Sequence, residues 1–353
     1  MGVTDLKRSQ LEKVAMHRDH LRKEPHLRWL FFEITNRCNL HCGHCGSSCS
    51  SEGRSLTLSD VQRTLKSIPQ DKPAVCLTGG EPMLHPHFYE IADCVRRLGF
   101  PWGMTTNATL IDESATARLK KAGMSTVSVS IDGMEQSHDR LRQRQGAWKN
   151  AIRGLRALQN AGFEPQVTSV FHQGNIDELD QVYELLCDMG ITSWRPINVE
   201  PIGRACESGD MLLTPEQFSH LLTYIRSKRF DPCCRMEVTF GCSHYLGVED
   251  ERMVRDHYFL CGAGILTASV RSNGDICACL DIENRPELVQ GNIGTDDFMD
   301  VWLNRFQAFR RDRTADCSRC VECPERFLCG GDSTHTWDFR RHEPLLCYQD
   351  FHS

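Results

Sequence analysis

The stretch Cys38-Asn-Leu-His-Cys42-Gly-His-Cys45 decides the fold of this chain of 353 residues. It follows residues 29–35, an apolar and strand-like segment, and it places three thiolates in one tight loop. That arrangement suits three corners of a cubane 4Fe-4S cluster, which four thiolates usually hold, so one iron stays open for another ligand. A structural zinc site is the alternative, because His41, His44 and Cys49 are close in sequence. Zinc sites usually combine two spaced pairs of ligands in a closed shell, however, and no second pair follows closely.

The motif resembles that of the radical S-adenosylmethionine (radical SAM) superfamily, whose hallmark is Cys-x3-Cys-x-aromatic-Cys after the first barrel strand. The resemblance implies that Cys38, Cys42 and Cys45 hold a 4Fe-4S cluster and that the methionine end of S-adenosylmethionine (SAM) chelates the open iron. Reductive cleavage of SAM would then give a 5'-deoxyadenosyl radical, which abstracts hydrogen from unactivated carbon. His44 takes the position that contacts the adenine in the family, and Cys49 is expected to be an extra thiol that is not a ligand.

Three later stretches follow in the order that the family shows. The segment Thr78-Gly-Gly-Glu-Pro82 matches the second family motif, although alone it would indicate only a turn. Glycines at a strand end permit close approach of the backbone. By resemblance, the residues that bind SAM are Gly79, Gly80, Glu81 and Pro82 at its ammonium group, Asn107, Ser130 and Asp132 at its ribose and carboxylate, and Arg142, which can grip the carboxylate bidentately.

Strand-like and helix-like segments alternate along the first two thirds of the chain, which indicates an α/β fold with a parallel sheet. The predicted strands are residues 29–35, 74–78, 102–106, 126–131, 165–171 and 193–200. Six units fall short of the eight of a closed barrel. We therefore expect a partial (β/α)6 TIM-like barrel, open at its side, followed by a small irregular domain that binds iron-sulfur clusters. The expected divisions are an N-terminal extension (1–24), the barrel (25–205), a bridge (206–258) and the cluster domain (259–353).

A second set of cysteines fills the last third of the chain and resembles the SPASM extension, which carries up to two auxiliary 4Fe-4S clusters. By that resemblance the distal cluster takes Cys320, Cys323, Cys329 and Cys347, and the proximal cluster takes Cys261 and Cys279. The family has a further cysteine where this chain has Ser333. The proximal cluster would therefore recruit Cys277, Cys317, Cys242 or Asp332, keep an open iron, or be absent. Two auxiliary clusters are favoured over one, and a zinc ribbon at residues 317–329 is the alternative.

The auxiliary clusters predict a net oxidation, since a nearby cluster can accept an electron from a substrate radical. A base is then needed, and Asp281 is the candidate, although the preferred interpretation of this residue is an acid in a solvated turn. The preferred function is oxidation or crosslinking of a peptide or protein, whose leader would need a separate recognition protein or would dock directly. The alternative is a dehydrogenase or epimerase acting on a small metabolite such as a sugar or aminoglycoside. A mere electron carrier would leave the Gly-Gly-Glu-Pro motif without a use.

Composition narrows the setting. The net charge near −6 and the dispersed Lys and Arg residues argue against a nucleic-acid partner. The N-terminus lacks an apolar signal core, and no segment approaches the length of a membrane span. An odd count of 19 cysteines also argues against a paired disulfide framework. We therefore expect a cytoplasmic protein with reduced thiols, served by flavodoxin or ferredoxin as reductant.

Overall fold

The computed structural model describes residues 3–47, 49, 53–69, 71–206, 209–241 and 244–351. Cys242, one of the thiols considered for the proximal cluster, lies outside this part of the chain.

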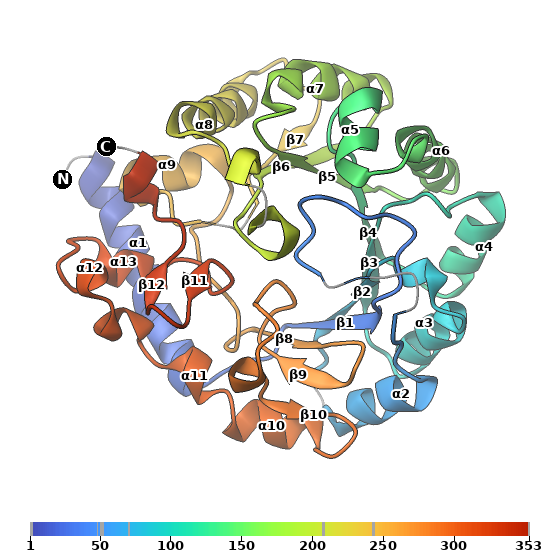
Figure 1. Ribbon diagram of the computed structural model, residues 1–353, viewed down its shortest axis with the longest axis horizontal. Helices are drawn as coiled ribbons and strands as arrows, with labels where there is room; N and C mark the ends of the chain where they lie inside the picture. Colours follow the sequence, from blue (N-terminus) through green and yellow to red (C-terminus); the bar gives the residue numbers. More distant parts are fainter. Residues whose placement is uncertain are drawn as a thin grey trace.

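One curved sheet organises the molecule, and Figure 1 shows its strands arranged around the centre. Within the described residues its order is β10-β9-β8-β1-β2-β3-β4-β5-β6-β7. The six predicted strands are present as β1 (Trp29–Thr35), β2 (Ala74–Gly79), β3 (Trp102–Thr106), β4 (Thr126–Ser130), β5 (Gln166–Phe171) and β6 (Ser193–Asn198). Each pairs in parallel with the next. The predicted α/β fold is confirmed.

Two short strands extend the parallel sheet beyond the six that the sequence predicts. β7 (Glu237–Val238) pairs with β6 at one edge, and β8 (Thr267–Val270) pairs with β1 at the other. β9 (Asp275–Cys277) and β10 (Gly291–Asn292) then continue the β8 edge in antiparallel fashion. The C-terminal region is thus hydrogen-bonded directly to the first barrel strand, while the expected division at residue 258 stays a prediction.

Helices cover the outer face of the sheet (Figure 1). They are α2 (Leu58–Ser67), α3 (Phe88–Arg97), α4 (Glu113–Lys121), α5 (Glu135–Arg142), α6 (Ala147–Asn160) and α7 (Leu179–Asp188). Alternate side chains of β1, such as Leu30 and Phe32, are fully buried in one core with Val61 and Leu65 of α2. The two periodicities, near two in strands and 3.6 in helices, give each element one apolar face, so the faces pack together.

The open side of the parallel sheet is occupied by the C-terminal region. It contains α8 (Pro215–Phe230), α9 (Gly247–Val254), α10 (Phe298–Asn304), α11 (Gln307–Arg310), α12 (Ser318–Val321), α13 (Arg326–Cys329) and the hairpin of β11 (Trp337–Asp338) and β12 (Glu343–Pro344). Most of these elements are only a turn long. They still pack into the core of the sheet, where Phe298, Trp302 and Phe306 of this region are buried.

The N-terminal extension is a helix of 21 residues, α1 (Val3–Lys23), which lies against α9 and α13. Arg18 in this helix donates to the backbone carbonyls of Leu328 (3.0 Å) and Phe327 (2.5 Å). Figure 1 places both chain ends on this side of the molecule. No helix in the described residues combines the length and the apolar character needed to cross a membrane.

Candidate active site

The three motif cysteines lie together at the C-terminal ends of the barrel strands. They follow β1 and line one cavity with residues from the ends of the next three strands. The lining residues are Cys38, Leu40, Cys42, His44, Cys45, Cys49, Thr78, Gly79, Gly80, Thr105, Thr106, Asn107, Ser130, Arg142 and Arg204. In a barrel this edge is where active sites lie.

The two motif glycines bring the end of β2 against the start of the cysteine loop. A Cβ atom at Gly79 would lie 2.1 Å from the carbonyl oxygen of Thr35, and one at Gly80 would lie 2.4 Å from that of Arg37. The backbone N–H of Gly80 donates to Thr35 (2.9 Å), and that of Glu81 donates to Arg37 (2.8 Å). Glycine is needed here because the two backbones touch.

Glu81 and Pro82 lie behind the cavity wall and are buried. The Glu81 carboxylate accepts hydrogen bonds from the Thr106 hydroxyl (2.8 Å) and the Asn107 backbone N–H (2.9 Å). Burial raises the pKa of Glu81 to about 7 despite these donors. Glu81 therefore joins the end of β2 to the end of β3, which fixes the edge on which Gly79 and Gly80 present their backbone.

Arg142 reaches the cavity from the last turn of α5. Its guanidinium donates to Asp132 Oδ2 through Nε (2.7 Å) and to the Cys42 sulfur through Nη1 (3.5 Å). Asp132 is fully buried, and its other oxygen accepts from the backbone N–H of Val170 (2.9 Å). Burial alone would raise the pKa of Asp132, but Arg142 lowers it to about 2. Asp132 thus holds the charged Arg142 in place, while Arg142 and Ser130 themselves line the cavity.

Two polar atoms of the cavity are left for a ligand. Nδ1 of His44 and Nη2 of Arg204 are buried and have no hydrogen-bond partner among the described residues. Burial lowers the pKa of His44 to about 4, so its ring is neutral. Three thiols, a neutral ring and cationic guanidinium groups fit a 4Fe-4S cluster with SAM beside it. Arg204 was not predicted as a site residue, and its only sequence signal is its place after the last predicted strand.

Polar side chains continue from this cavity along the inside of the barrel. Thr105 lines the cavity and is exposed, although β3 lies in the middle of the sheet. Cys76 approaches Thr105 (3.9 Å), Ser128 approaches Thr168 (3.0 Å), and Arg195 Nη2 donates to Thr168 (3.2 Å). The inside of the barrel is therefore polar and carries a cation.

The four thiols predicted for the distal cluster line a single cavity in the C-terminal region. Cys320, Cys323, Cys329 and Cys347 are brought together from three short segments. This set fits a cubane cluster, which is usually held by four thiolates. The sulfur of Cys317 accepts from the backbone N–H of Cys320 (3.2 Å), so Cys317 lies beside the distal set.

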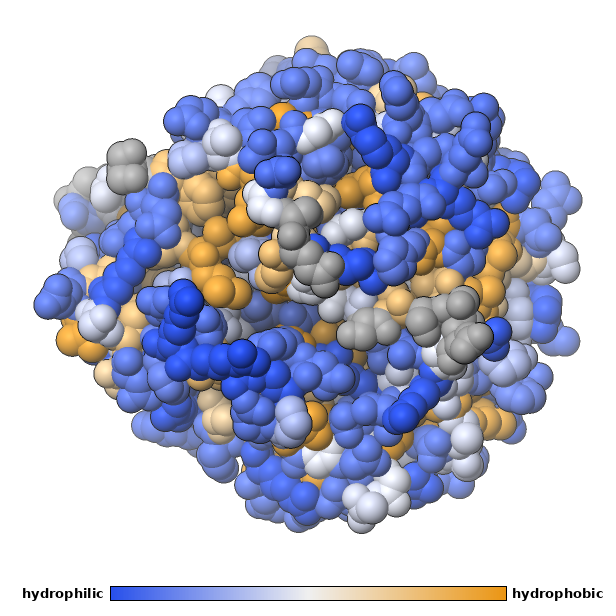
Figure 2. Space-filling view, in the orientation of Figure 1, coloured by the Kyte–Doolittle hydropathy of each residue, from blue (hydrophilic) through white to orange (hydrophobic). Residues whose placement is uncertain are grey.

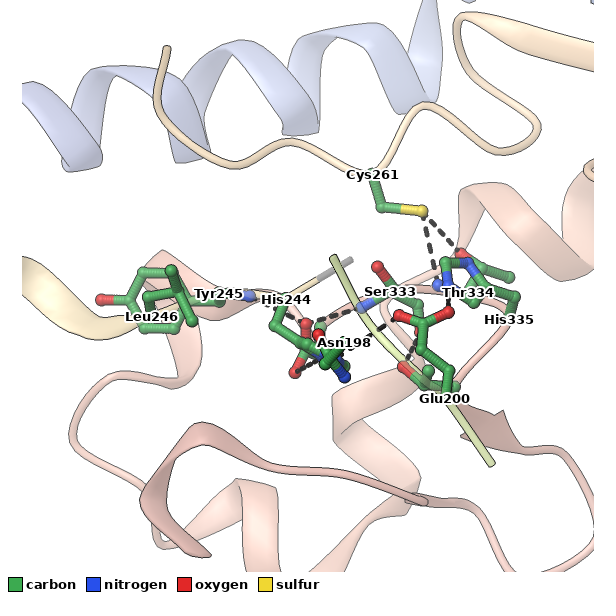
Figure 3. Close-up of polar contacts among 12 residues, drawn as sticks. Asn198, Glu200, His244, Tyr245, Leu246, Cys261, Ser333, Thr334 and His335 are labelled. Carbon is green, nitrogen blue, oxygen red and sulfur yellow. Dashed lines mark hydrogen bonds and ion pairs between the residues drawn. The ribbon is translucent and has the colours of Figure 1, made fainter. Parts of the chain in front are cut away.

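The proximal set is smaller. Burial raises the pKa of the Cys279 thiol, and Cys261 and Cys277 both lie close enough for their charges to raise it too; Cys277 is itself buried. The Cys261 sulfur also contacts the Thr334 hydroxyl (3.2 Å) and accepts a hydrogen bond from the backbone N–H of Thr334 (3.4 Å). Thr334 directly follows Ser333, which is buried (Figure 3). Compared with the distal set, these residues offer an incomplete shell for a cubane, which four thiolates usually hold.

Two predicted acids near the proximal set lie in different places. Asp281 Oδ2 is 3.8 Å from the Cys279 sulfur, and Asp281 Oδ1 faces Gly46 of the cysteine loop. Asp332 instead accepts from the backbone N–H groups of Tyr245 (2.9 Å) and Ser333 (2.8 Å). Asp281 therefore lies between the Cys279 thiol and the cysteine loop.

A buried network that the sequence did not reveal joins the end of β6 to the C-terminal region (Figure 3). Glu200 contacts His335 (2.6 Å) and His244 (3.4 Å), and His244 contacts Asn198 (3.3 Å) and Asp332 (3.7 Å). Burial would lower the pKa of His335, but Glu200 raises it to about 10, so this histidine is charged. Glu200 and His335 are 135 positions apart, and no local pattern connects them.

Comparisons with known proteins agree with this site. A model of the radical SAM superfamily matches residues 32–186, and a model of the SPASM iron-sulfur cluster-binding domain matches residues 261–324. A pre-heme d1 synthase of Dinoroseobacter shibae is 30% identical over 330 residues, which cover 86% of this chain and 81% of the relative. The chain belongs to the radical SAM superfamily. It is a radical SAM enzyme with a SPASM domain, and it therefore uses SAM and 4Fe-4S clusters.

Two further matches cover nearly the whole of this radical SAM enzyme. An AdoMet-dependent heme synthase of Oleidesulfovibrio alaskensis is 26% identical over 92% of this chain and 88% of the relative. The crystal structure of anSMEcpe with bound AdoMet and Cp18Cys peptide has a TM-score of 0.71 and 18% identity, over 93% of this chain and 95% of that one. The second match concerns the fold alone. Both confirm that the barrel and the C-terminal region belong to one known arrangement.

Proposed function

We propose that this enzyme oxidises a side chain of a tetrapyrrole. The observation that carries the proposal is the full-length similarity to the heme synthase and the pre-heme d1 synthase, which cover both the barrel and the C-terminal region. Both names concern tetrapyrrole products. The preference for a peptide that the sequence suggested thereby becomes the second candidate.

The polar inside of the barrel supports an acidic substrate. Arg195 lies on the inside of the barrel and donates to Thr168. Thr105, which also faces the inside of the barrel, lines the cofactor cavity. Many tetrapyrroles carry carboxylate side chains. A guanidinium binds a carboxylate through charge-assisted hydrogen bonds, which are stronger than neutral ones. We propose that Arg195 binds one substrate carboxylate and so places a neighbouring carbon next to SAM.

When bound, SAM and the clusters supply the radical that abstracts hydrogen and the acceptor for a second electron. The chain's own residues do the rest. Cys38, Cys42 and Cys45 hold the first cluster, the Gly79–Gly80 backbone receives the ammonium group of SAM, and Arg142, fixed by Asp132, receives its carboxylate. After the hydrogen atom and the second electron have left, the substrate is a cation that becomes neutral by releasing a proton. Asp281 takes that proton, since it lies between the cysteine loop and Cys279.

The test is an anaerobic reaction of the reconstituted enzyme with SAM, reductant and iron coproporphyrin III, a tetracarboxylate. Mass spectrometry should show an oxidised porphyrin that forms in step with 5'-deoxyadenosine. The Arg195→Gln variant should raise the KM for the porphyrin by about tenfold, because one charge-assisted bond is lost, while Arg153→Gln on the exposed face of α6 should not. Cleavage of SAM that leaves the porphyrin unchanged would contradict the proposal.

A peptide substrate is the second candidate, because the similar fold of anSMEcpe was crystallised with a peptide. A peptide would dock at the cofactor end of the barrel, directly or with a separate leader-recognition protein. The test is coexpression with any short open reading frame beside the gene. A loss of mass in that peptide, together with an unchanged porphyrin, would favour this candidate.

For either substrate we propose flavodoxin or ferredoxin as reductant and the cytoplasm as location. The predicted cluster ligands Cys38, Cys42, Cys45, Cys261, Cys279, Cys320, Cys323, Cys329 and Cys347 are not in disulfides, as a reducing compartment would require.

A further inference from the structure

The cofactor cavity contains a fourth thiol that the family motif does not include. The sulfur of Cys49 lies 3.6 Å from that of Cys45. All four thiols line the same cavity. Cys49 is half-buried and reaches the cavity from the loop that carries the motif itself. It is therefore positioned within the thiol set and not beside it.

A cationic side chain lies on the wall of the same cavity. Arg204 lines this cavity together with Cys49 and the three motif cysteines. Its Nε donates to the carbonyl oxygen of Cys42 (2.8 Å), and its backbone N–H donates to that of Cys45 (3.1 Å). Arg204 is therefore fixed to the cysteine loop, beside the four thiols.

A cubane has four irons, and the motif supplies only three thiolates. Before SAM binds, the fourth iron needs some ligand. Other thiols of the chain are placed differently: Cys94 is buried in the core on α3, and Cys233 is exposed after α8. Cys49, in contrast, lines the cavity of the three motif cysteines, and its sulfur contacts that of Cys45.

We propose that Cys49 is the exchangeable fourth ligand of this cluster, bound to the open iron without SAM and displaced when SAM binds. Formation of the iron–sulfur bond releases the thiol proton to solvent. When the amino and carboxylate groups of SAM take the iron, that bond breaks and Cys49 takes up a proton again. No electron is transferred in the exchange. Cys49 would thus cover the open iron between turnovers. This proposal requires the radical SAM cluster, but it does not require that the substrate be a tetrapyrrole.

Cys49 and SAM would compete for one iron, so removal of Cys49 should tighten SAM binding. If the thiolate occupies the iron for about 90% of the time, the apparent Kd for SAM is raised about tenfold. The test compares the full reconstituted chain with its Cys49→Ala and Cys49→Ser variants, and with Cys233→Ala as control. Both Cys49 variants should bind SAM about tenfold more tightly in equilibrium dialysis, and the control should match the unaltered chain.

Paramagnetic resonance supplies a readout that is independent of activity. Cyanide is a small ligand that binds an open iron and changes the resonance signal of its cluster. The part of that cyanide-dependent signal that SAM abolishes belongs to the first cluster, and it is the part to be measured. Without SAM, that signal should develop at lower cyanide concentration in the Cys49 variants. Equal SAM affinity and equal cyanide response in all four proteins would overturn the proposal. Loss of about four irons in both Cys49 variants would overturn it too, because Cys49 would then be a fixed ligand.

Discussion

The cofactor end of the barrel and the C-terminal region both gather cysteine thiols, but different contacts hold them. In the barrel the three thiols lie within one loop, which backbone hydrogen bonds fix to the Gly79–Gly80 edge. In the C-terminal region the thiols come from separate short turns, and arginine side chains donate to the backbone carbonyls of those turns. Arg18 binds Leu328 and Phe327, and Arg313 binds Gly331 (2.9 Å). The first site depends on local spacing, whereas the second depends on contacts between segments far apart in sequence.

The barrel edge should show its dependence on Glu81 through pH. Burial raises the pKa of Glu81 to about 7, above its ordinary value of 4.5. A raised folded-state pKa means that the stabilisation is complete below about pH 4.5 and is lost as the pH rises through about 7. The free energy of unfolding should therefore fall by up to about 3 kcal/mol between about pH 5 and pH 8. Urea unfolding under anaerobic conditions measures this fall.

The matched variant is Glu81→Gln, which keeps the shape of the side chain and cannot ionise. Its free energy of unfolding should change much less over the same pH range. If the variant and the unaltered chain showed the same slope, the pH dependence would arise elsewhere and the role given to Glu81 would be wrong.

A methyl group at Gly80 should damage the cofactor site and spare the other. A Cβ there would lie 2.4 Å from the carbonyl oxygen of Arg37 and 2.8 Å from the Cβ of Cys38, so the cysteine loop must shift. A displacement near 1 Å can cost about 10²-fold in rate, and we expect a loss of that order in SAM cleavage by Gly80→Ala. Auxiliary iron should stay constant. Gly209→Ala is the control, because a Cβ at Gly209 meets open space.

The Arg18→Met variant should show the opposite result, with a weakened distal cluster site and unchanged SAM cleavage. This change leaves the carbonyls of Leu328 and Phe327 without their donor, which should cost about 2 kcal/mol in the C-terminal region. Chelators should then remove distal iron faster, while SAM cleavage continues. Arg8→Met is the control, since Arg8 forms an exposed ion pair with Glu12 and such pairs contribute little to stability. Equal iron release from both variants would show that α1 does not support the distal site.

The sequence predicted the barrel well because its elements carry regular patterns. β1 to β6 were found from apolar and β-branched segments, and the cysteine spacing identified the first cluster site. β7 and β8 were missed because two and four residues are too few to show a period. The first 24 residues were expected only as an extension, since the partners of α1 on α9 and α13 lie more than 200 positions away.

The candidate site shows the same division. The residues that line the cavity from motif positions were named in advance, and the structure places Gly79, Gly80 and Arg142 on its wall. The network of Glu200, His244 and His335 was not, because tertiary packing alone brings these groups together. Sequence spacing reveals chemistry that one loop contains, and it does not reveal chemistry that two distant segments share.

The most direct test of two separate thiol sets is to replace Cys38, Cys42 and Cys45 together with alanine and to measure iron and SAM cleavage on the same reconstituted sample. The variant should form no 5'-deoxyadenosine, since the open iron is lost. It should keep about four irons if only the distal set fills, or about eight if the proximal set fills as well. Unchanged SAM cleavage, or zinc in place of the remaining iron, would contradict the account.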